Sequence, residues 1–499
     1  MARAAPDGSA LLELARLGHQ GVVRTTGARR RSRWAALAAG ALVLSCGLLA
    51  RAQNPRDRHN PGPEPFARRV VATGLANPWE VTWGPDGQLW ITERTGFRVT
   101  RINPADGSTR VALELDDVYQ SVEQDGLLGM ALHPGLLKGQ GVDHVFVAYT
   151  YDRDPGPGVT RRIRIRRYTY DDRSQQLEAP LDVLTDMPAH DDHGGGRLAI
   201  GPDGMLYFTR GDLGSNFLAN VCNPNRAQDL PTADQIRVKD WSTYQGKILR
   251  LSLDGSIPRD NPVLAGVRSH IYTYGHRNPQ GLAFSPSRRL YASDHGPSTD
   301  DEVDLIVPGK NYGWPHVAGF QDDQSYVYAN WSASTPTPCS ALTFDNLHPP
   351  ASVAQYKESA WRHPDFVAPI ATLFTVPAGY DFAAFGNATV APAGLEVYAA
   401  SAIPTWANSI LVTGMRTGAV YRLKLDGDGT GVVGAPTEYF RAANRYRDLA
   451  VSPDGRRIFL VTDSKGITLD ASGRRTETLA NPGAVLELTY TGPRAQGGR

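Results

Sequence analysis

The residues with the clearest chemical potential lie in one stretch, where three carboxylates follow a Gly-Pro turn. Asp300, Asp301 and Glu302 come shortly after Gly296 and Pro297. A proline-fixed turn can present main-chain carbonyl oxygens, and the carboxylates add further oxygen ligands. Oxygen-only ligand sets suit Ca²⁺, which accepts about six to eight of them in a flexible geometry. The stretch therefore predicts a Ca²⁺ site.

A second group is a histidine- and aspartate-rich run at positions 190–193, followed by three glycines. Histidines at i and i+3 with carboxylates between them could bind a transition metal such as Zn²⁺. Alternatively, one histidine is a general base, oriented by Asp192 or a neighbour, on a loop whose glycines let a substrate approach the backbone. A polar loop without a chemical role is the third interpretation, and the local sequence leaves all three open.

Arginines form the third group. Arg277 and Asn278 follow a strand-like segment and a glycine, so we expect both at the end of a strand. Arg445 and Arg447 alternate with Tyr446, which places the two arginines on one face of a strand. Two cations on one face repel unless an anion neutralises them, and arginine recognises carboxylates in a fork-like geometry, so a polycarboxylate ligand fits. The alternative is a surface pair bridged to acidic neighbours.

Charge is unevenly distributed along the 499 residues, although the net charge is only +1. The first 52 residues contain eight arginines and two acidic residues, which leaves 44 basic and 49 acidic side chains, a net charge of −5, for the remainder. A mildly acidic body argues against nonspecific nucleic-acid binding, which needs a basic face to displace counterions. We therefore expect no nucleic-acid partner.

The first 52 residues have the three parts of an export signal. Arginines at 29–33 precede an apolar run at 34–50, and an A-x-A site occupies 50–52. A retained anchor is one alternative, because these 17 apolar or small residues almost span a bilayer. Lipidation at Cys46 is another. We expect a periplasmic or secreted protein that touches the membrane only through this segment, if the segment stays uncleaved.

A local pattern recurs in the rest of the chain: a turn built on Pro-Asp-Gly, then a short apolar strand. Full copies occupy 84–92, 201–209 and 452–462, with a degenerate copy at 285–291 and a fainter one at 133–147. Proline fixes φ and Asp-Gly completes the reversal, so each copy indicates a hairpin. Repeated four-stranded units favour a β-propeller. A pair of β-sandwiches is the alternative.

The pattern also suggests boundaries. Residues 53–70 are rich in proline and arginine and are expected to form a flexible leader, 71–492 a single propeller domain and 493–499 a tail. Residues 320–375 lack the repeat and indicate a long excursion from the ring. If Cys46 is removed, Cys222 and Cys339 remain as a pair that either forms a disulfide or stays as two buried thiols.

Taken together and in order, six motifs connect these observations. They are QDGLLG (124–129), DH (192–193), GHRNPQG (275–281), GP with DDE (296–302), NYGWP (311–315) and NRYRD (444–448). The chain thereby resembles the soluble glucose dehydrogenases that use pyrroloquinoline quinone (PQQ), within the glucose/sorbosone dehydrogenase family, from about Pro78 to Tyr490. The resemblance implies an all-β, six-bladed propeller with four-stranded antiparallel sheets. It also implies PQQ- and Ca²⁺-dependent oxidation of an aldose at C1 to its lactone, with hydride transfer to the quinone and electrons passed to an external acceptor.

The resemblance assigns roles by position. It implies that His193 is the general base, that Arg277 acts at the reacting centre, and that Gln124 and Asp192 bind the sugar. The implied cofactor-binding residues are Arg277, Asn278, Thr389, Arg416, Arg445 and Arg447. The carbonyls of Gly296 and Pro297 would bind the catalytic Ca²⁺. Structural Ca²⁺ ions at a homodimer contact would be bound by Glu302, Tyr312, Ala318, Phe320, Asp322 and Glu358.

The chain departs from the family pattern at several positions. Arg416 replaces a cofactor-binding lysine, and His295 replaces a glutamine before the Gly-Pro turn. The segment 376–390 is shorter than in the glucose enzymes, and Asn387 falls where a tryptophan of the sugar site is expected, although Thr389 is retained. With less aromatic surface, sugar preference could be broader, weaker or different. We therefore expect a sugar dehydrogenase without naming the sugar.

Two other functions remain as alternatives. A lactonase-type propeller hydrolase would use Ca²⁺ and a histidine, but would not need Arg277, Arg445 and Arg447 to converge. A non-catalytic sugar-binding propeller would be consistent with an altered substrate loop. PQQ binding discriminates both from the dehydrogenase.

Overall fold

The computed structural model describes residues 60–121, 124–154, 156–470 and 472–493. The expected export signal at 1–52, the beginning of the expected leader and most of the expected tail lie outside the described residues. Within the described ranges, no helix combines the length and the apolar character needed to span a bilayer.

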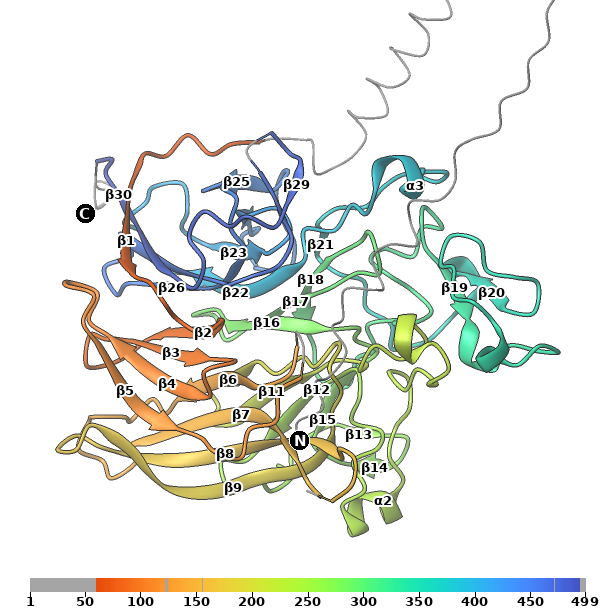
Figure 1. Ribbon diagram of the computed structural model, residues 1–499, viewed down its shortest axis with the longest axis horizontal. Helices are drawn as coiled ribbons and strands as arrows, with labels where there is room; N and C mark the ends of the chain where they lie inside the picture. Colours follow the sequence, from red (N-terminus) through yellow and green to blue (C-terminus); the bar gives the residue numbers. More distant parts are fainter. Residues whose placement is uncertain (1–59, 122–123, 155, 471, 494–499) are drawn as a thin grey trace, which may run out of the picture. The chain divides into compact units, whose positions relative to one another are not determined.

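Within these residues, six four-stranded antiparallel sheets form the blades of a β-propeller (Figure 1). Blade I contains β2 (Pro78–Trp83), β3 (Leu89–Glu93), β4 (Arg98–Ile102) and β5 (Thr109–Glu114). Blade II contains β6 (Leu127–Leu132), β7 (His144–Asp152), β8 (Arg161–Asp171) and β9 (Gln176–Pro188). Blade III contains β10 (Leu198–Ile200), β11 (Leu206–Arg210), β12 (Lys247–Leu251) and β15 (Ile271–Tyr274).

The remaining blades have the same strand order. Blade IV contains β16 (Pro279–Phe284), β17 (Leu290–Asp294), β18 (Glu302–Ile306) and β21 (Ala371–Thr372). Blade V contains β22 (Pro392–Tyr398), β23 (Ser409–Gly414), β24 (Ala419–Lys424) and β25 (Thr437–Tyr439). Blade VI contains β26 (Tyr446–Val451), β27 (Arg457–Thr462), β30 (Val485–Tyr490) and β1 (Phe66–Ala72).

The first strands of neighbouring blades close the ring. β26 contacts β2, β2 contacts β6, β6 contacts β10, β10 contacts β16, β16 contacts β22, and β22 contacts β26. The prediction of an all-β, six-bladed propeller is therefore confirmed. Apolar side chains fill the spaces between blades: Phe146 and Ile163 of blade II, for example, share one buried cluster with Phe208 and Leu249 of blade III.

Blade VI is completed by the N-terminal strand β1, which pairs antiparallel with β30, so that Phe66 lies opposite Tyr490. β1 thus begins five residues before the expected propeller boundary at residue 71. This strand is difficult to predict from the sequence because most of its side chains are exposed. The strand is held mainly by main-chain pairing with β30. Phe66 is the anchor, since its ring packs against Trp406 and Phe440.

Every predicted turn connects the first and second strands of a blade, as the hairpin interpretation requires. In blade I, the Asp86 carboxylate accepts hydrogen bonds from Gln88 N and Trp90 Nε1 and pairs with Arg101 at 2.5 Å. In blade III, Asp203 makes the equivalent contacts with Tyr207 and Arg250. The turn aspartate therefore also joins the second strand to the third. Blade V lacks the motif and uses residues 399–408 instead.

Two long excursions leave the ring, one between β11 and β12 and the other between β18 and β21. The disulfide Cys222–Cys339, with Cα atoms 5.5 Å apart, joins them and resolves the open question about these thiols. Among the described residues, the helices are α2 (Ala233–Val238), α3 (Phe382–Phe385) and the 3₁₀ turns η3 (Leu218–Asn220), η4 (Trp331–Ala333), η5 (Cys339–Ala341) and η6 (Glu358–Ala360). The two-stranded sheets outside the blades pair β13 (Val263–Leu264) with β14 (Val267–Arg268), β19 (Val327–Asn330) with β20 (Ala354–Lys357), and β28 (Thr468–Leu469) with β29 (Arg475–Thr476).

Candidate active site

The topology collects the predicted site residues at one end of the blades. In an antiparallel four-stranded blade, the connections between strands one and two and between strands three and four lie at one end. The connection between strands two and three and the one that leads to the next blade lie at the opposite end. Gln124 precedes β6, His193 lies between β9 and β10, Arg277 lies between β15 and β16, Gly296 lies between β17 and β18, and Arg445 precedes β26. All five connections are therefore at the end opposite the Pro-Asp-Gly turns.

His193 is paired with an aspartate that the sequence did not single out. Its Nδ1 lies 2.7 Å from Asp212 Oδ1, with the residues 6% and 1% exposed. The other Asp212 oxygen accepts hydrogen bonds from Trp314 Nε1 at 2.7 Å and Asn225 Nδ2 at 2.8 Å. Burial acts to raise the pKa of Asp212, but His193, the charge of Arg277 and the hydrogen bond from Trp314 outweigh it and hold that pKa below its ordinary value.

This pairing selects between the interpretations of the 190–193 run. An ionised carboxylate accepts hydrogen bonds only, so Asp212 keeps the proton of His193 on Nδ1 and leaves the Nε2 lone pair available. His190 instead lies beside Asp191, with Nδ1 to Oδ1 at 2.5 Å. The geometry thus favours a general base oriented by Asp212. The available sequence signal was the Gly-Asp-Leu-Gly run directly after β11.

The two residues expected to bind the sugar, Gln124 and Asp192, lie beside this histidine. Gln124 Nε2 donates to Asp192 Oδ1 at 2.5 Å, and the same oxygen accepts from His193 N at 2.9 Å and lies 3.7 Å from His193 Nε2. Asn278 Nδ2 donates to Gln124 Oε1 at 3.2 Å. These four residues thus form one polar wall around the Nε2 atom.

Arg277 supplies a fixed positive charge at the same place. Its guanidinium lies 5.2 Å from the centre of the Trp314 ring and 5.8 Å from that of Phe217, and its Nη1 donates to the His295 carbonyl at 3.3 Å. Its Nε is buried and has no hydrogen-bond partner within the described part of the chain. Burial, with Arg277 beside it, lowers the pKa of His295 well below its ordinary value. A neutral His295 and an unused Arg277 donor favour a polar or anionic ligand here.

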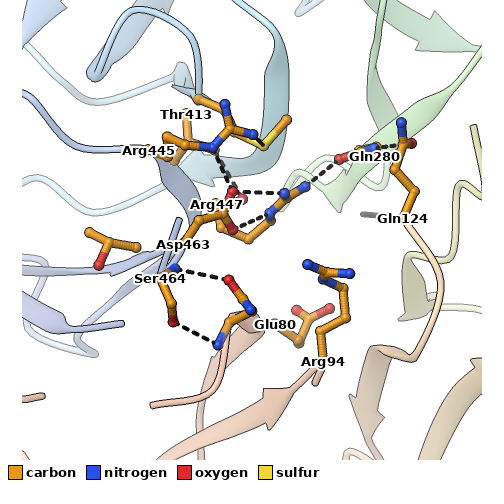
Figure 2. A network of polar contacts seen from close by, with 12 residues as sticks. Glu80, Arg94, Gln124, Gln280, Thr413, Arg445, Arg447, Asp463 and Ser464 are labelled. Atoms are coloured by element: carbon orange, nitrogen blue, oxygen red, sulfur yellow. Dashed lines mark hydrogen bonds and ion pairs between the residues drawn. The ribbon is translucent and has the colours of Figure 1, made fainter. Parts of the chain in front are cut away.

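Arg445 and Arg447 share one anion, Asp463. Arg447 donates from Nε and Nη2 to both Asp463 oxygens at 2.9 Å, and Arg445 Nε donates at 3.0 Å (Figure 2). Both arginines contact the same carboxylate, although Arg445 lies just before β26 and only Arg447 is in the strand. The acidic bridge of the alternative interpretation is also present, but the arginines are buried or half-buried rather than on the surface. Two cations against one carboxylate leave an excess positive charge, which suits a further anion.

A chain of amides joins this arginine pair to the sugar-binding wall. Arg447 Nη1 donates to Gln280 Oε1 at 2.9 Å, and Gln280 Nε2 reaches Gln124 Oε1 at 3.5 Å (Figure 2). Since Gln124 donates to Asp192, the polar contacts run without a break from Arg447 to the neighbour of His193. The sequence showed the glutamines only as motif positions, not as a connection.

The Gly-Pro turn is held by Asp301. This carboxylate accepts hydrogen bonds from Gly296 N at 3.0 Å, Thr389 Oγ1 at 2.7 Å and Val390 N at 2.6 Å. Burial raises the pKa of Asp301 to about 7. Thr389, expected to bind the cofactor, thus contacts the residue that shapes the turn. Arg416 N donates to the Val390 carbonyl at 3.0 Å, which places its main chain beside the same segment.

The acidic residues expected to bind structural Ca²⁺ also converge. Glu358 accepts from Ala318 N and Asp323 N at 3.0 Å each, and Glu302 accepts from Gly319 N at 2.5 Å. Burial, together with the charge of Asp300, raises the pKa of Glu358 to about 7.

The segment that carries Ala318, Phe320 and Asp322 therefore folds around two buried carboxylates, a donor set that fits a hard cation. The Tyr312 hydroxyl is committed to Leu305 O at 2.6 Å, so a contribution from Tyr312 would come from its carbonyl.

Two adjoining cavities lie next to the site residues and share Pro297 in their linings. The inner one, about 30 Å³, is lined by His193, Arg277, Phe217 and Pro297 among others, and the outer one, about 350 Å³, shares Pro297. The outer cavity is also lined by Tyr380 and Phe382 of the segment 376–390. The aromatic surface expected to be missing at Asn387 is therefore partly supplied by neighbouring residues.

The fold and the site combine a six-bladed β-propeller with a buried His193–Asp212 pair and two arginines that converge on Asp463. A sequence model of the Glucose / Sorbosone dehydrogenase family matches residues 75–375 and 379–470. The chain belongs to this family, as its motifs predicted, and is an enzyme of the dehydrogenase class.

Individual relatives agree with this assignment. The chain is 41% identical to quinoprotein glucose dehydrogenase B of Acinetobacter calcoaceticus over 86% of this chain and 91% of that protein. It is 26% identical to the aldose sugar dehydrogenase YliI of Escherichia coli over 81% of this chain and 92% of that protein. The solved PQQ-bound aldose sugar dehydrogenase of Streptomyces coelicolor superposes with a TM-score of 0.59 at 27% identity, covering 86% of this chain and 99% of that one.

Proposed function

We propose that the protein is a PQQ- and Ca²⁺-dependent aldose dehydrogenase that oxidises the anomeric carbon to a lactone and passes the electrons to an external acceptor. One observation carries the proposal. The buried pair of His193 and Asp212 lies on the same cavity wall as Arg277 and Pro297. A base and a fixed cation in one enclosed site suit removal of the proton from the anomeric hydroxyl and of a hydride from C1 of the sugar.

His193 acts as the general base. Its Nε2 takes the proton of the anomeric hydroxyl, while Asp212 holds the ring orientation and stabilises the imidazolium that forms. Gln124 and Asp192 border Nε2 and offer an amide and a carboxylate to sugar hydroxyls. These contacts position C1 without taking part in the redox step, so we expect them to affect binding and orientation more than proton transfer.

The donor set fits PQQ, whose three carboxylates are anionic. PQQ, when bound with Ca²⁺, supplies the two-electron acceptor that protein side chains lack. Arg445 and Arg447 would face its carboxylates, because Asp463 neutralises only one of their two charges. Arg277 would stabilise negative charge that develops during the reaction. The carbonyls of Gly296 and Pro297 would hold Ca²⁺, and Asn278, Thr389 and Arg416 would contribute to binding of the cofactor.

We extend the proposal to assembly and location. The excursion that carries the expected structural Ca²⁺ ligands exposes several large apolar side chains, namely Phe320, Val327, Leu347 and Tyr356. Exposed large apolar side chains on the segment that carries a cation site support a Ca²⁺-dependent homodimer. The Cys222–Cys339 disulfide supports an oxidising compartment, in keeping with a periplasmic or secreted protein.

The decisive experiment is dye-linked sugar oxidation by the purified protein, with and without added PQQ and Ca²⁺, across a panel of aldoses. We expect activity only when both are added. His193→Ala should lower kcat by about 10² to 10⁴ while PQQ still binds, and His133→Ala, in the β6–β7 turn at the opposite end of the propeller, should leave kcat unchanged. Lactone hydrolysis without PQQ would favour the hydrolase instead, and PQQ-free sugar binding would favour the binding module.

A further inference from the structure

A buried polar cluster that takes no part in the proposed reaction lies behind the Arg277 loop, between blades III and IV. It consists of His276, Asp294 and Asp304, which are 0%, 2% and 0% exposed. One nitrogen or oxygen atom from each residue lies within 4.8 Å of the others. Strand pairing explains the convergence. Asp304 lies opposite Ala292 in the β17–β18 pair, so it shares a face with Asp294, two residues further along β17.

The polar atoms of the cluster are only partly satisfied. Both oxygens of Asp304 and the Nδ1 atom of His276 are buried and have no hydrogen-bond partner among the described residues. Asp294, in contrast, accepts from Arg277 N at 3.1 Å and Asn278 N at 2.6 Å. An uncompensated buried carboxylate costs several kcal/mol. Something absent from the polypeptide therefore compensates Asp304, either a cation or a proton.

The histidine is arranged as metal-binding histidines are. His276 Nε2 lies 2.9 Å from the Thr273 hydroxyl, and the ring stacks on Tyr312 with centroids 4.6 Å apart. A hydrogen bond at one ring nitrogen and stacking on the ring fix the orientation and direct the other nitrogen at the ligand. Nδ1 lies 3.3 Å from Asp294 Oδ2. Two ligands of a tetrahedral Zn²⁺ at about 2.0–2.1 Å lie about 3.4 Å apart, so the spacing is suitable.

We propose that His276, Asp294 and Asp304 bind a divalent transition-metal ion, with Zn²⁺ the best fit. The imidazole nitrogen decides the class, because Ca²⁺ takes oxygen ligands whereas imidazole suits zinc and its neighbours. Two carboxylates and a dication also balance in charge. Since all three side chains are buried, the ion has a structural role. Through Asp294 it fixes the main chain of Arg277 and Asn278 to β17 and β18, the two middle strands of blade IV.

The test measures metal content in untagged full-length protein purified with excess Ca²⁺, so that oxygen-ligand sites are filled with Ca²⁺. We expect bound zinc that survives dialysis against a chelator and is released on unfolding, because the site is closed to solvent. Asp304→Asn, which preserves shape, should lower the zinc content by about one ion per chain and lower the Tm. Asp345→Asn, in the exposed His348–Asp345 pair, should change neither quantity.

The alternative occupant is a proton on Asp304, and it predicts the opposite. Asp304→Asn would then leave the zinc content unchanged and leave the Tm equal or higher, and that result would overturn the proposal. If the variant does not fold, crystals of the wild-type protein decide the matter. Anomalous difference maps on both sides of the zinc edge should show a peak between the three side chains. A missing peak, or one with the signature of calcium, would refute a transition-metal site.

Discussion

Asp212 Oδ1 lies 2.7 Å from His193 Nδ1, and this contact determines which ring nitrogen can act as a base. Asp212→Asn preserves the size of the side chain but introduces a donor, which would stabilise the tautomer with the proton on Nε2. In the Ser-His-Asp enzymes the same change costs about 10⁴ in kcat. We expect kcat for sugar oxidation to fall by about 10² to 10⁴, measured with a reducible dye at saturating PQQ.

Asn225→Ala is the graded control, because it removes only one of the hydrogen bonds that Asp212 accepts. We expect a decrease in kcat of about tenfold or less, consistent with the loss of roughly one hydrogen bond. If Asp212→Asn kept kcat within a few-fold of the wild type, the orienting role of Asp212 would be wrong.

A second prediction concerns the anion between the two arginines. Asp463→Asn leaves Arg445 and Arg447 without their shared carboxylate, and breaking a buried ion pair costs about 3–5 kcal/mol. We expect the Tm of the PQQ-free protein to fall, and added PQQ to raise the Tm of the variant more than that of the wild type, because the ligand supplies the missing negative charge. Thermal unfolding with and without PQQ measures both effects.

Asp260→Asn removes an exposed carboxylate from Arg250 and should change the free energy of unfolding by less than about 1 kcal/mol. Equal stabilisation of the wild type and Asp463→Asn by PQQ would show that the cofactor does not face this arginine pair.

The sequence predicted those parts of the molecule that local rules determine. The Pro-Asp-Gly turns identified the hairpins because each turn aspartate acts within its own blade, as Asp86 does with Trp90 and Arg101. The sequence could not predict β1, because its exposed side chains show little apolar pattern. The position of β1 depends on pairing with a strand about 420 residues later in the chain.

The candidate site shows the same division. His193 and the arginines were visible as unusual residue types at strand ends. Asp212 and Asp463 were not, because their importance depends on partners 19 and 16 to 18 residues away. The convergence of His276 with Asp304 likewise needs the register of two paired strands and the loop of a neighbouring blade.

A third prediction concerns sugar selection. Tyr380 and Phe382 line the outer cavity near Pro297, and aromatic faces bind the apolar face of a sugar ring. Tyr380→Ala should raise KM for the preferred aldose by about tenfold, equivalent to about 1.4 kcal/mol, with little change in kcat or PQQ affinity. Asn387→Trp should lower KM if this position also faces the sugar. Unchanged KM values across an aldose panel for both variants would place the sugar elsewhere.

The last prediction uses the protonation of Glu358. Burial raises its pKa from an ordinary 4.5 to about 7, so the folded protein binds more protons than the unfolded chain between these values. The free energy of unfolding of the Ca²⁺-free protein therefore falls as the pH rises from about 4.5 through about 7, and the loss is complete above that range. Glu358→Gln should not show this decrease in the free energy of unfolding, because glutamine does not ionise. Above pH 7 and without Ca²⁺, we expect the variant to be more stable than the wild type by about 2 kcal/mol.

Calcium should reverse the order of stability of the wild type and Glu358→Gln. An ionised Glu358 at the cation site stabilises the Ca²⁺-bound state, so saturating Ca²⁺ should make the wild type more stable than Glu358→Gln above pH 7. Denaturant unfolding at pH 5 and pH 8, with Ca²⁺ or a chelator, measures all four conditions, and the exposed Glu114→Gln serves as the control. Curves that keep the same order with and without Ca²⁺ would contradict a role for Glu358 as a ligand. A crossing that appears only at pH 8 requires both the raised pKa and the bound cation, because neither effect alone inverts the order.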